Sequence, residues 1–246
     1  MAKKAARNSR GKKNKASRSK KSTGLIARIR RWVLRVVLGI VAVFLALILI
    51  YAVVNPPITH TIWSEWRRLG KVERDWVSIE EISPVMARSA VAAEDANFCL
   101  HWGFDVEAIR DALEDGSSRG ASTITQQVVK NVFLWQGRSW VRKALETSIT
   151  PIVEIVWSKQ RILEVYLNVA ETGQGVFGVE AAAQKYYGVS AAKMSPVQAA
   201  RLAAILPSPR KRSVTDPSAR TRRRAASILD GAATIRADGR AACFED

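Results

Sequence analysis

The 246-residue sequence has few of the residues that build metal centres and disulfide-rich folds. Its two cysteines, Cys99 and Cys243, are too few for a disulfide scaffold and match no metal-ligand spacing. Its two histidines, His60 and His101, cannot form a histidine-rich metal site. Whether the cysteines pair with each other depends on their distance in space, which the sequence does not give.

Acidic residues are absent from residues 1–31, which hold 13 of the lysines and arginines. Residues 32–209 hold 17 basic and 17 acidic residues, and residues 210–246 hold 9 and 5. The net charge of +17 therefore belongs mostly to the N-terminal segment. A nucleic-acid-binding domain would carry its positive charge on the folded part. We therefore expect no nucleic-acid partner.

Charge is also absent from Val36–Val54, a run of 19 nearly all apolar residues. Such a run spans about 30 Å as a helix, which is the thickness of the bilayer interior. A buried core helix is the alternative, but core helices of this length usually keep a polar face. No A-x-A cleavage site follows, so we predict an uncleaved transmembrane signal anchor over residues 33–54. The basic tail 1–31 is predicted to be disordered, cytoplasmic and attracted to anionic lipid.

Strand-like alternation is scarce beyond the span, whereas helix-start signals recur. These signals are Ser83-Pro84, Thr123 with Gln126, Ser139, Ser158 and Ser195-Pro196 with Gln198. They predict a mainly α domain over residues 81–210 with at most a short hairpin. The tryptophan-rich connector 55–80 suits a membrane interface or ordinary packing equally well. The basic extension 211–246 contains an arginine-rich helix candidate to which we assign no function.

The segment Glu94–Gly103 places a carboxylate pair, an aromatic residue, a histidine and a glycine at the end of a predicted helix. A glutamate among apolar groups has a raised pKa, as a general base at neutral pH requires. Alone the signal is weak, because acidic pairs are common at helix ends.

Two later segments also concentrate polar groups. Gly120–Asn131 starts with a glycine and hydroxyl residues, an arrangement that leaves free N–H groups for an anion. In the helix that follows, Gln126 and Lys130 share one face and Gln127 and Asn131 the next; a solvated face is the alternative. Arg142 and Glu146 form an i,i+4 pair, for which a surface ion pair is the simpler interpretation.

Six segments in order match the motifs of one enzyme family. They are Glu94–Gly103 (E-D-x-x-F-x-x-H-x-G), Gly120–Asn131 (G-[AG]-S-T-I-[ST]-Q-Q-x-x-K-N), Arg142–Glu146 (R-K-x-x-E), Ser158–Asn168 (S-K-x-x-I-L-x-x-Y-L-N), Gly175–Tyr187 and Leu202–Pro209 (L-A-A-x-L-P-x-P). The sequence therefore resembles the family 51 peptidoglycan glycosyltransferases. The stretch between Gly103 and Gly120 is rather short, which leaves the shape of that loop open.

The resemblance implies polymerisation of lipid II, the disaccharide-pentapeptide carried on undecaprenyl pyrophosphate, into β-1,4-linked glycan with inversion at MurNAc C1. By motif position, Glu94 and Glu146 are the expected catalytic carboxylates. Glu94 would be the base, and Glu146 would orient the cations or bind a divalent metal ion. The expected substrate-binding residues are Asp95, Phe98, His101, Ser122, Thr123, Gln126, Gln127, Lys130, Asn131, Arg142 and Lys159.

The resemblance also implies a lysozyme-like, mainly α fold with a small membrane-proximal lobe behind one transmembrane helix. The expected cofactor is a divalent cation, Mg or Mn, with no organic cofactor. The expected partners are lipid II, the growing glycan, the inner membrane, and proteins of cell-wall synthesis and division. The expected location is the bacterial inner membrane, with a cytoplasmic N-terminus and a periplasmic catalytic domain that serves cell-wall biogenesis and cell shape.

Three alternatives carry a different function. A transpeptidase uses S-x-x-K, which Ser190–Lys193 spells, but it lies inside the glycosyltransferase motifs with no K-[ST]-G after it, so we expect a monofunctional enzyme. A lytic transglycosylase on the same fold would need one acid and no pyrophosphate-binding cations. A membrane-anchored scaffold would tolerate the loss of Glu94 or Glu146, and both are present.

Overall fold

The computed structural model describes residues 6–114, 122–137 and 139–245 and divides into two compact units, Met1–Ile50 and Tyr51–Asp246. Helix α1 (Ala6–Tyr51) contains Ile26–Tyr51, which in the described chain is the one helix long and apolar enough to cross a membrane. The prediction of a disordered basic tail is wrong from Ala6 onward. Lysine, arginine and alanine are good helix formers, and they extend a helix that the apolar span has already nucleated. The first five residues lie outside the described residues.

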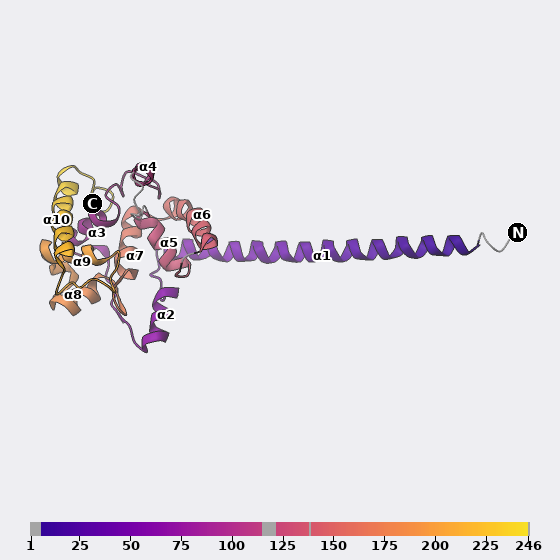
Figure 1. Ribbon diagram of the computed structural model, residues 1–246, viewed down its shortest axis with the longest axis horizontal. Helices are drawn as coiled ribbons and strands as arrows, with labels where there is room; N and C mark the ends of the chain where they lie inside the picture. Colours follow the sequence, from indigo (N-terminus) through magenta and orange to yellow (C-terminus); the bar gives the residue numbers. More distant parts are fainter. Residues whose placement is uncertain (1–5, 115–121, 138, 246) are drawn as a thin grey trace. The chain divides into compact units, whose positions relative to one another are not determined.

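The second unit is mainly helical, as the sequence predicts (Figure 1). Its α-helices are α2 (His60–Leu69), α3 (Pro84–Glu94), α4 (Val106–Glu114), α5 (Ile124–Phe133), α6 (Trp140–Val156), α7 (Lys159–Val169), α8 (Val179–Tyr187), α9 (Pro196–Ile205) and α10 (Ala219–Ala237). Two 3-10 turns, η1 (Ile79–Glu81) and η2 (Ala191–Lys193), complete the helical elements among the described residues.

The predicted helix starts are confirmed at α3, α5, α6, α7 and α9. Four of the capping side chains accept a hydrogen bond from a first-turn amide, and α5 and α9 also have complete capping boxes. At α3 the hydroxyl of Ser83 instead donates to Met194 O. Proline as the first residue of α3 and α9 is favourable, because the amide that proline lacks has no partner within the helix.

The sheet is larger than the single hairpin that we predicted. Strands β2 (Glu171–Gly173) and β3 (Val176–Phe177) form the hairpin, and β1 (Glu73–Arg74) from the connector adds to β3 in parallel. Strands of two or three residues are too short to show alternation in the sequence. The sheet consequently joins the connector to the segment after α7.

Two groups of helices position the residues discussed below. In one, α5 packs against α6 and α7, and α7 is largely buried, with Ile162, Leu163, Tyr166 and Leu167 among its buried residues. In the other, α3 packs against α9 and α10. The C-terminal end of α3 and the N-terminal end of α5 meet through a hydrogen bond from Ile124 N to Asp95 Oδ2. The first and second motifs are therefore adjacent in space.

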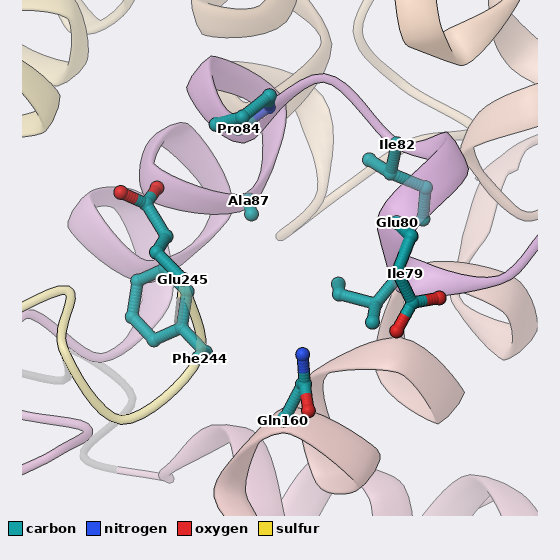
Figure 2. Close-up of a pocket in the computed structure, with 8 residues that line it drawn as sticks. All are labelled: Ile79, Glu80, Ile82, Pro84, Ala87, Gln160, Phe244 and Glu245. Atoms are coloured by element: carbon teal, nitrogen blue, oxygen red, sulfur yellow. The ribbon is translucent and has the colours of Figure 1, made fainter.

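The end of the chain returns to α3. Cys99 and Cys243 form a disulfide with their Cα atoms 5.6 Å apart, which answers the question that the sequence left open. Phe244 and Glu245 lie next to the start of α3 and border a cavity of about 160 Å³ (Figure 2). Its lining is mostly apolar and contains two glutamates but no lysine or arginine, so it does not suit an anionic substrate.

Candidate active site

Glu94 is the last residue of α3 and the first residue of the first motif, and its side chain contacts α5. Its Oε2 atom accepts a hydrogen bond of 3.0 Å from Nε2 of Gln127, which lies one turn into α5. Its Oε1 atom is buried and has no hydrogen-bond partner among the described residues. Glu94 Oε1 thus keeps its capacity to accept a hydrogen bond, whereas Oε2 is held by Gln127.

The surroundings of Glu94 make it a stronger base than an exposed glutamate. Only 11% of its side chain is exposed. Burial raises the pKa of Glu94 above its ordinary value, because water no longer stabilises the charged form. The hydrogen bond from Gln127 and the positive charges of Arg224, Lys130 and Arg212 lower the pKa in the opposite direction. The net effect is a raised pKa, which suits proton abstraction near neutral pH.

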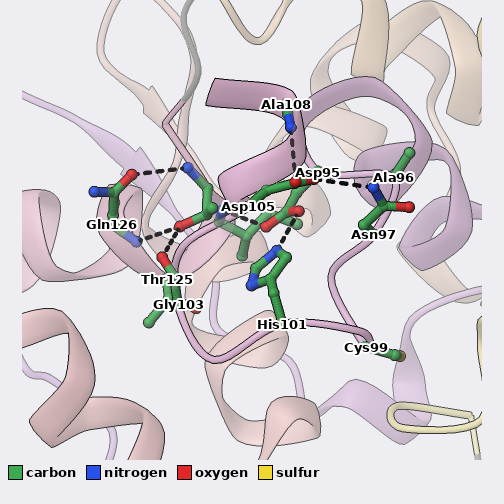
Figure 3. Close-up of polar contacts among 12 residues, drawn as sticks. Asp95, Ala96, Asn97, Cys99, His101, Gly103, Asp105, Ala108, Thr125 and Gln126 are labelled. Carbon is green, nitrogen blue, oxygen red and sulfur yellow. Dashed lines mark hydrogen bonds and ion pairs between the residues drawn. The ribbon is translucent and has the colours of Figure 1, made fainter. Parts of the chain in front are cut away.

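Asp95 holds the first motif in shape and faces the protein interior (Figure 3). Its Oδ1 atom lies 2.7 Å from His101 Nε2, and its Oδ2 atom accepts from Ile124 N at 3.0 Å. Asp105 binds Asn97 and the amide of Ala108 in the same region. These hydrogen bonds stabilise the loop between α3 and α4, which directly follows Glu94.

The start of α5 is fixed by its capping residues. Thr123 Oγ1 accepts from Gln126 N, and Gln126 Oε1 accepts from Thr123 N. Thr123 Oγ1 also donates to Gly103 O at 2.7 Å, which ties the cap to the end of the first motif. Gln126 is 4% exposed, so its side chain serves the cap. Gln127, one position later, is the residue that this arrangement presents to Glu94.

A cation cluster surrounds the second carboxylate, Glu146 on α6, whose side chain is 3% exposed. Arg142 binds its Oε2 atom, and Lys143 Nζ lies 2.5 Å from its Oε1 atom. Lys143 also reaches Ser122 Oγ at 3.3 Å, and Arg142 Nε donates to Gly137 O. The carboxylate therefore orients two cations of the R-K-x-x-E motif at the start of the second motif.

Lys130 on α5 lies within the electrostatic influence of both carboxylates. Burial lowers the pKa of Lys130 below its ordinary value, and the positive charges of Arg142 and Lys143 lower it further. Glu146 and Glu94 raise the pKa of Lys130. Lys130 thus interacts electrostatically with both Glu94 and the cation cluster.

Glu94 and Gln127, which are hydrogen-bonded to each other, line two different cavities. One, of about 430 Å³, is lined by Ala92, Ala93, Glu94, Asp95, Ala96, Asn97, Asp105, Ala108, Ser122 and Thr123. The other, of about 360 Å³, is lined by Thr61, Gln127, Lys130, Asn131, Gln136, Tyr166, Val169, Ala170, Glu171, Leu206, Pro207, Pro209 and Arg210. Glu94 therefore borders the first cavity, and its partner Gln127 borders the second.

Some expected substrate-binding residues have their polar atoms bound within the protein. Lys159 Nζ binds His101 O at 2.7 Å and Glu154 Oε1 at 3.0 Å, and it lies 4.4 Å from the centre of the buried Phe98 ring. Phe98, His101 and Lys159 line neither of the two cavities, whereas Asp95 lines the 430 Å³ cavity. Gly120 and Ala121 of the second motif lie outside the described residues.

The structure also identifies residues that the sequence analysis did not name. Thr61 and Gln136 line the 360 Å³ cavity and bind each other through Gln136 Nε2 and Thr61 Oγ1 at 2.7 Å. Arg210 lines it as well and pairs with Glu65 and Glu171. These residues come from the connector, from a loop and from the end of the last motif. Only the tertiary fold brings them together, so no local pattern marks them.

Asp95, His101 and Asp105 have ligand-type atoms within 4.8 Å of one another. The two carboxylates, however, use all four oxygen atoms in the hydrogen bonds described above. A metal ion would have to replace contacts that shape the first motif. We therefore assign this group a structural role.

The comparisons with known proteins agree with the geometry. The model of the family described as transglycosylase matches residues 61–233. A protein of Jannaschia sp. named biosynthetic peptidoglycan transglycosylase is 59% identical over 94% of this chain and 98% of its own length. Proteins with the same name from Cronobacter sakazakii and Caulobacter vibrioides are 46% and 45% identical, over 86% and 87% of this chain and 92% and 96% of their own lengths. The family match begins at the first turn of α2 and extends well into α10.

Proposed function

The chain belongs to the transglycosylase family, and from this we propose that Glu94 and the cation cluster around Glu146 carry out glycosyl transfer in peptidoglycan synthesis. The activity is that of a peptidoglycan glycosyltransferase on a mainly α, lysozyme-like domain. Its substrates are lipid II and the growing glycan strand. The single observation that carries the proposal is Glu94, which lines one cavity, binds Gln127 in the lining of a second, and has three cations around it.

Glu94 acts as the base on the acceptor. The acceptor is the 4-hydroxyl group of GlcNAc in lipid II, and Oε1 of Glu94 is the atom that takes its proton. The 4-oxygen of GlcNAc then attacks C1 of MurNAc at the end of the growing chain, and the bond from C1 to the pyrophosphate breaks. The α-linked pyrophosphate becomes a β-1,4 bond, so one displacement with inversion accounts for the product.

The cation cluster acts on the leaving group. Undecaprenyl pyrophosphate gains negative charge as the C1–O bond breaks, and Lys130, Arg142 and Lys143 stabilise that charge. Glu146 orients Arg142 and Lys143 before the substrate arrives, so little reorganisation is needed during the reaction. The serine of the second motif, Ser122, accepts from Lys143 and fixes its direction. A lytic enzyme, which releases no pyrophosphate, would have no use for this cluster.

A divalent cation does not fit the surroundings of Glu146. Each of its oxygens already accepts a hydrogen bond from a cationic side chain. A metal ion bound there would sit beside two positive charges and would be repelled. We therefore derive no step through a metal, and a metal requirement stays a prediction from the resemblance.

The membrane location is part of the proposal. Ile26–Tyr51 is the candidate span, and the 10 basic residues before it favour a cytoplasmic N-terminus. The second unit would then face the periplasm, where it meets a substrate held in the same bilayer. A single membrane anchor raises the local concentration of enzyme around lipid II.

The two residues of the S-x-x-K match lie away from the proposed site. Ser190 precedes η2, and Lys193 at its end is exposed. Neither residue lines the cavities beside Glu94. We expect Lys193→Ala to keep the activity of the wild type, which makes it a matched control for the test below.

The test is to incubate the full chain in detergent with labelled lipid II and, separately, with preformed glycan. We expect polymer from lipid II that a muramidase degrades, equal amounts from Lys193→Ala, and no cleavage of the glycan. Cleavage of preformed glycan without polymer would favour a lytic enzyme. No reaction with either substrate would favour a scaffold.

A further inference from the structure

Helix α10 is the part of the domain to which the sequence analysis assigned no function, yet it lies directly against the end of α3. Among the described elements, α10 has its most extensive contacts with α9 and α3. The backbones come so close that a methyl group on Gly231 would lie 3.3 Å from Ala92 Cβ, two residues before Glu94. In Figure 1 the two helices run side by side near the C-terminus.

Arg224 is the residue of α10 that reaches the active site. Its Nη2 atom donates to Ala93 O at 3.0 Å, and the same atom lies 3.6 Å from Glu94 Oε1. This oxygen is the one that Gln127 does not hold. A cation at the last turn of α3 is also favourable toward the helix dipole. Gln127 therefore hydrogen-bonds one oxygen of Glu94 and Arg224 pairs with the other, and the two residues come from different helices.

The segment that follows α10 is bound to the first motif at three points and to α3 at a fourth. The disulfide joins Cys243 to Cys99, and the ring centres of Phe244 and Phe98 lie 6.4 Å apart. Arg240 Nη1 donates to Ala96 O at 3.1 Å. Arg88 on α3 binds both carboxylate oxygens of Glu245 at 2.7 Å. Contacts on both sides of Glu94 thus set the distance between α10 and α3.

We propose that Arg224 is a positioning residue for the base Glu94, and that the Cys99–Cys243 disulfide keeps α10 where Arg224 can perform this role. This inference rests on the proposed function. The contact to Ala93 O fixes the guanidinium group, and the guanidinium group then directs Glu94 Oε1 toward the acceptor.

The charges around Glu94 agree with this role. The groups that face it are Arg224 from α10, Lys130 from α5, Arg212 after α9, its neighbour Asp95, and the buried Tyr166 of α7. The charge of Arg224 lowers the pKa of Glu94 against the effect of burial. Without Arg224, the pKa of Glu94 rises further, so that a smaller fraction of the base is ionised at neutral pH.

The first test compares three variants of the full chain in detergent with lipid II: Arg224→Gln, Arg224→Lys and Arg223→Gln. Arg223 is the exposed neighbour on the same helix and serves as the matched control. We expect Arg224→Gln to lower kcat by about tenfold with KM within about twofold, because Arg224 acts through the base. We also expect the acid limb of its pH–activity profile to move up by about one pH unit.

The control and the conservative variant separate this role from a purely structural one. Arg223→Gln should match the wild type, and Arg224→Lys should recover part of kcat and of the acid limb. An unchanged kcat and pH profile in Arg224→Gln would overturn the proposal. A rise in KM alone would also overturn it, because Arg224 would then bind substrate. A wild type that forms no polymer would refute the proposed function instead.

The second test concerns the disulfide. In the double variant Cys99→Ser with Cys243→Ser, we expect the acid limb to move in the same direction as in Arg224→Gln, but less. In the Arg224→Gln background, removing the disulfide should cause no further movement, because the two changes act through one contact. Reduction of the folded wild type with a thiol reagent gives the same comparison without resynthesis. An equal effect in both backgrounds would show that the disulfide acts independently of Arg224.

Discussion

The two glutamates of the site, Glu94 and Glu146, have different surroundings, and these suit them to different tasks. Glu94 has one oxygen held by an uncharged amide and the other without a hydrogen-bond partner in the described chain. Glu146 has both oxygens bound by cations. A carboxylate of the first kind takes up a proton readily, whereas one of the second kind orients the cations that bind it. The local environment, rather than the residue type, separates base from support.

Glu146→Gln should weaken the stabilisation of the leaving group. Arg142 and Lys143 lose the charge that orients them, and we expect kcat to fall by about 10². The pKa of Lys130, already lowered by burial, should fall further because Glu146 raises it. Lys130 must be protonated to act, so the alkaline limb of the activity should begin at a lower pH. The pH dependence of lipid II polymerisation measures both effects.

Glu164→Gln is the matched control, because Glu164 also pairs with an arginine, Arg161, at 2.5 Å but lines neither cavity beside Glu94. It should leave the alkaline limb in place. If Glu146→Gln kept both the wild-type kcat and the wild-type alkaline limb, the orienting role of Glu146 would be refuted.

At this scale the sequence could identify residues but not their contacts. Glu94, Gln127, Lys130, Arg142 and Glu146 were named from motif position, and the structure brings them together. The motif gave no way to separate Gln127, which binds Glu94, from Gln126, which serves the cap. Lys159 likewise matched a motif while its ammonium group binds His101 O and Glu154. Such distinctions depend on which way a side chain points in the folded chain.

At the scale of elements, the N-terminal end of α5 is the feature that connects folding to the site. Its first amide binds Asp95, its cap binds Gly103 O, and Gln127 binds Glu94. One helical turn therefore aligns the first and second motifs. Loosening that turn should affect stability and activity together.

Thr123→Ala removes the hydroxyl group that accepts from Gln126 N and donates to Gly103 O. We expect the free energy of unfolding to fall by about 1–2 kcal/mol, as for other lost N-caps. We also expect kcat to fall, because Gln127 is no longer held toward Glu94. Thr123→Ser keeps the hydroxyl group and should retain both properties. Denaturant unfolding and polymerisation rates provide the measurements, and equal stability of the two variants would contradict the assigned role of the cap.

Most helix starts could be predicted from the sequence, because caps are local. Helix α2 and the three-stranded sheet could not be predicted. Helix α2 lies in the segment interpreted as a tryptophan-rich connector, and its N-cap Thr59 was not recognised. Strand β1 acquires its structure only by pairing with β3, about 100 residues later. Non-local pairing of this kind leaves no periodicity in so short a segment.

At the scale of the whole molecule, the disulfide closes a loop of 144 residues and restricts where the domain can mature. Disulfides persist in oxidising compartments such as the periplasm and are rare in the cytosol. The basic residues before the candidate span favour the same orientation. Charge pattern and cysteine pairing therefore support the proposed topology independently, and only the first was visible in the sequence.

Thiol labelling in cells tests this topology. With a maleimide reagent added under denaturing conditions, Cys99 and Cys243 should resist modification in the full chain until a reductant is added. Replacing the basic residues of 1–31 with serine should increase the modified fraction, because fewer chains cross the membrane with the domain outside. Full modification of the unaltered chain without reductant would contradict a periplasmic domain.

The most direct measurement for the central claim is the rate of lipid II polymerisation by Glu94→Gln relative to the wild type in detergent. Glutamine keeps the shape of Glu94 but cannot take up the acceptor proton, so we expect the rate to fall by about 10² or more. Thermal unfolding of both proteins should confirm that the variant is folded. Polymer formed by the folded variant at the wild-type rate would contradict the assignment of Glu94 as the base.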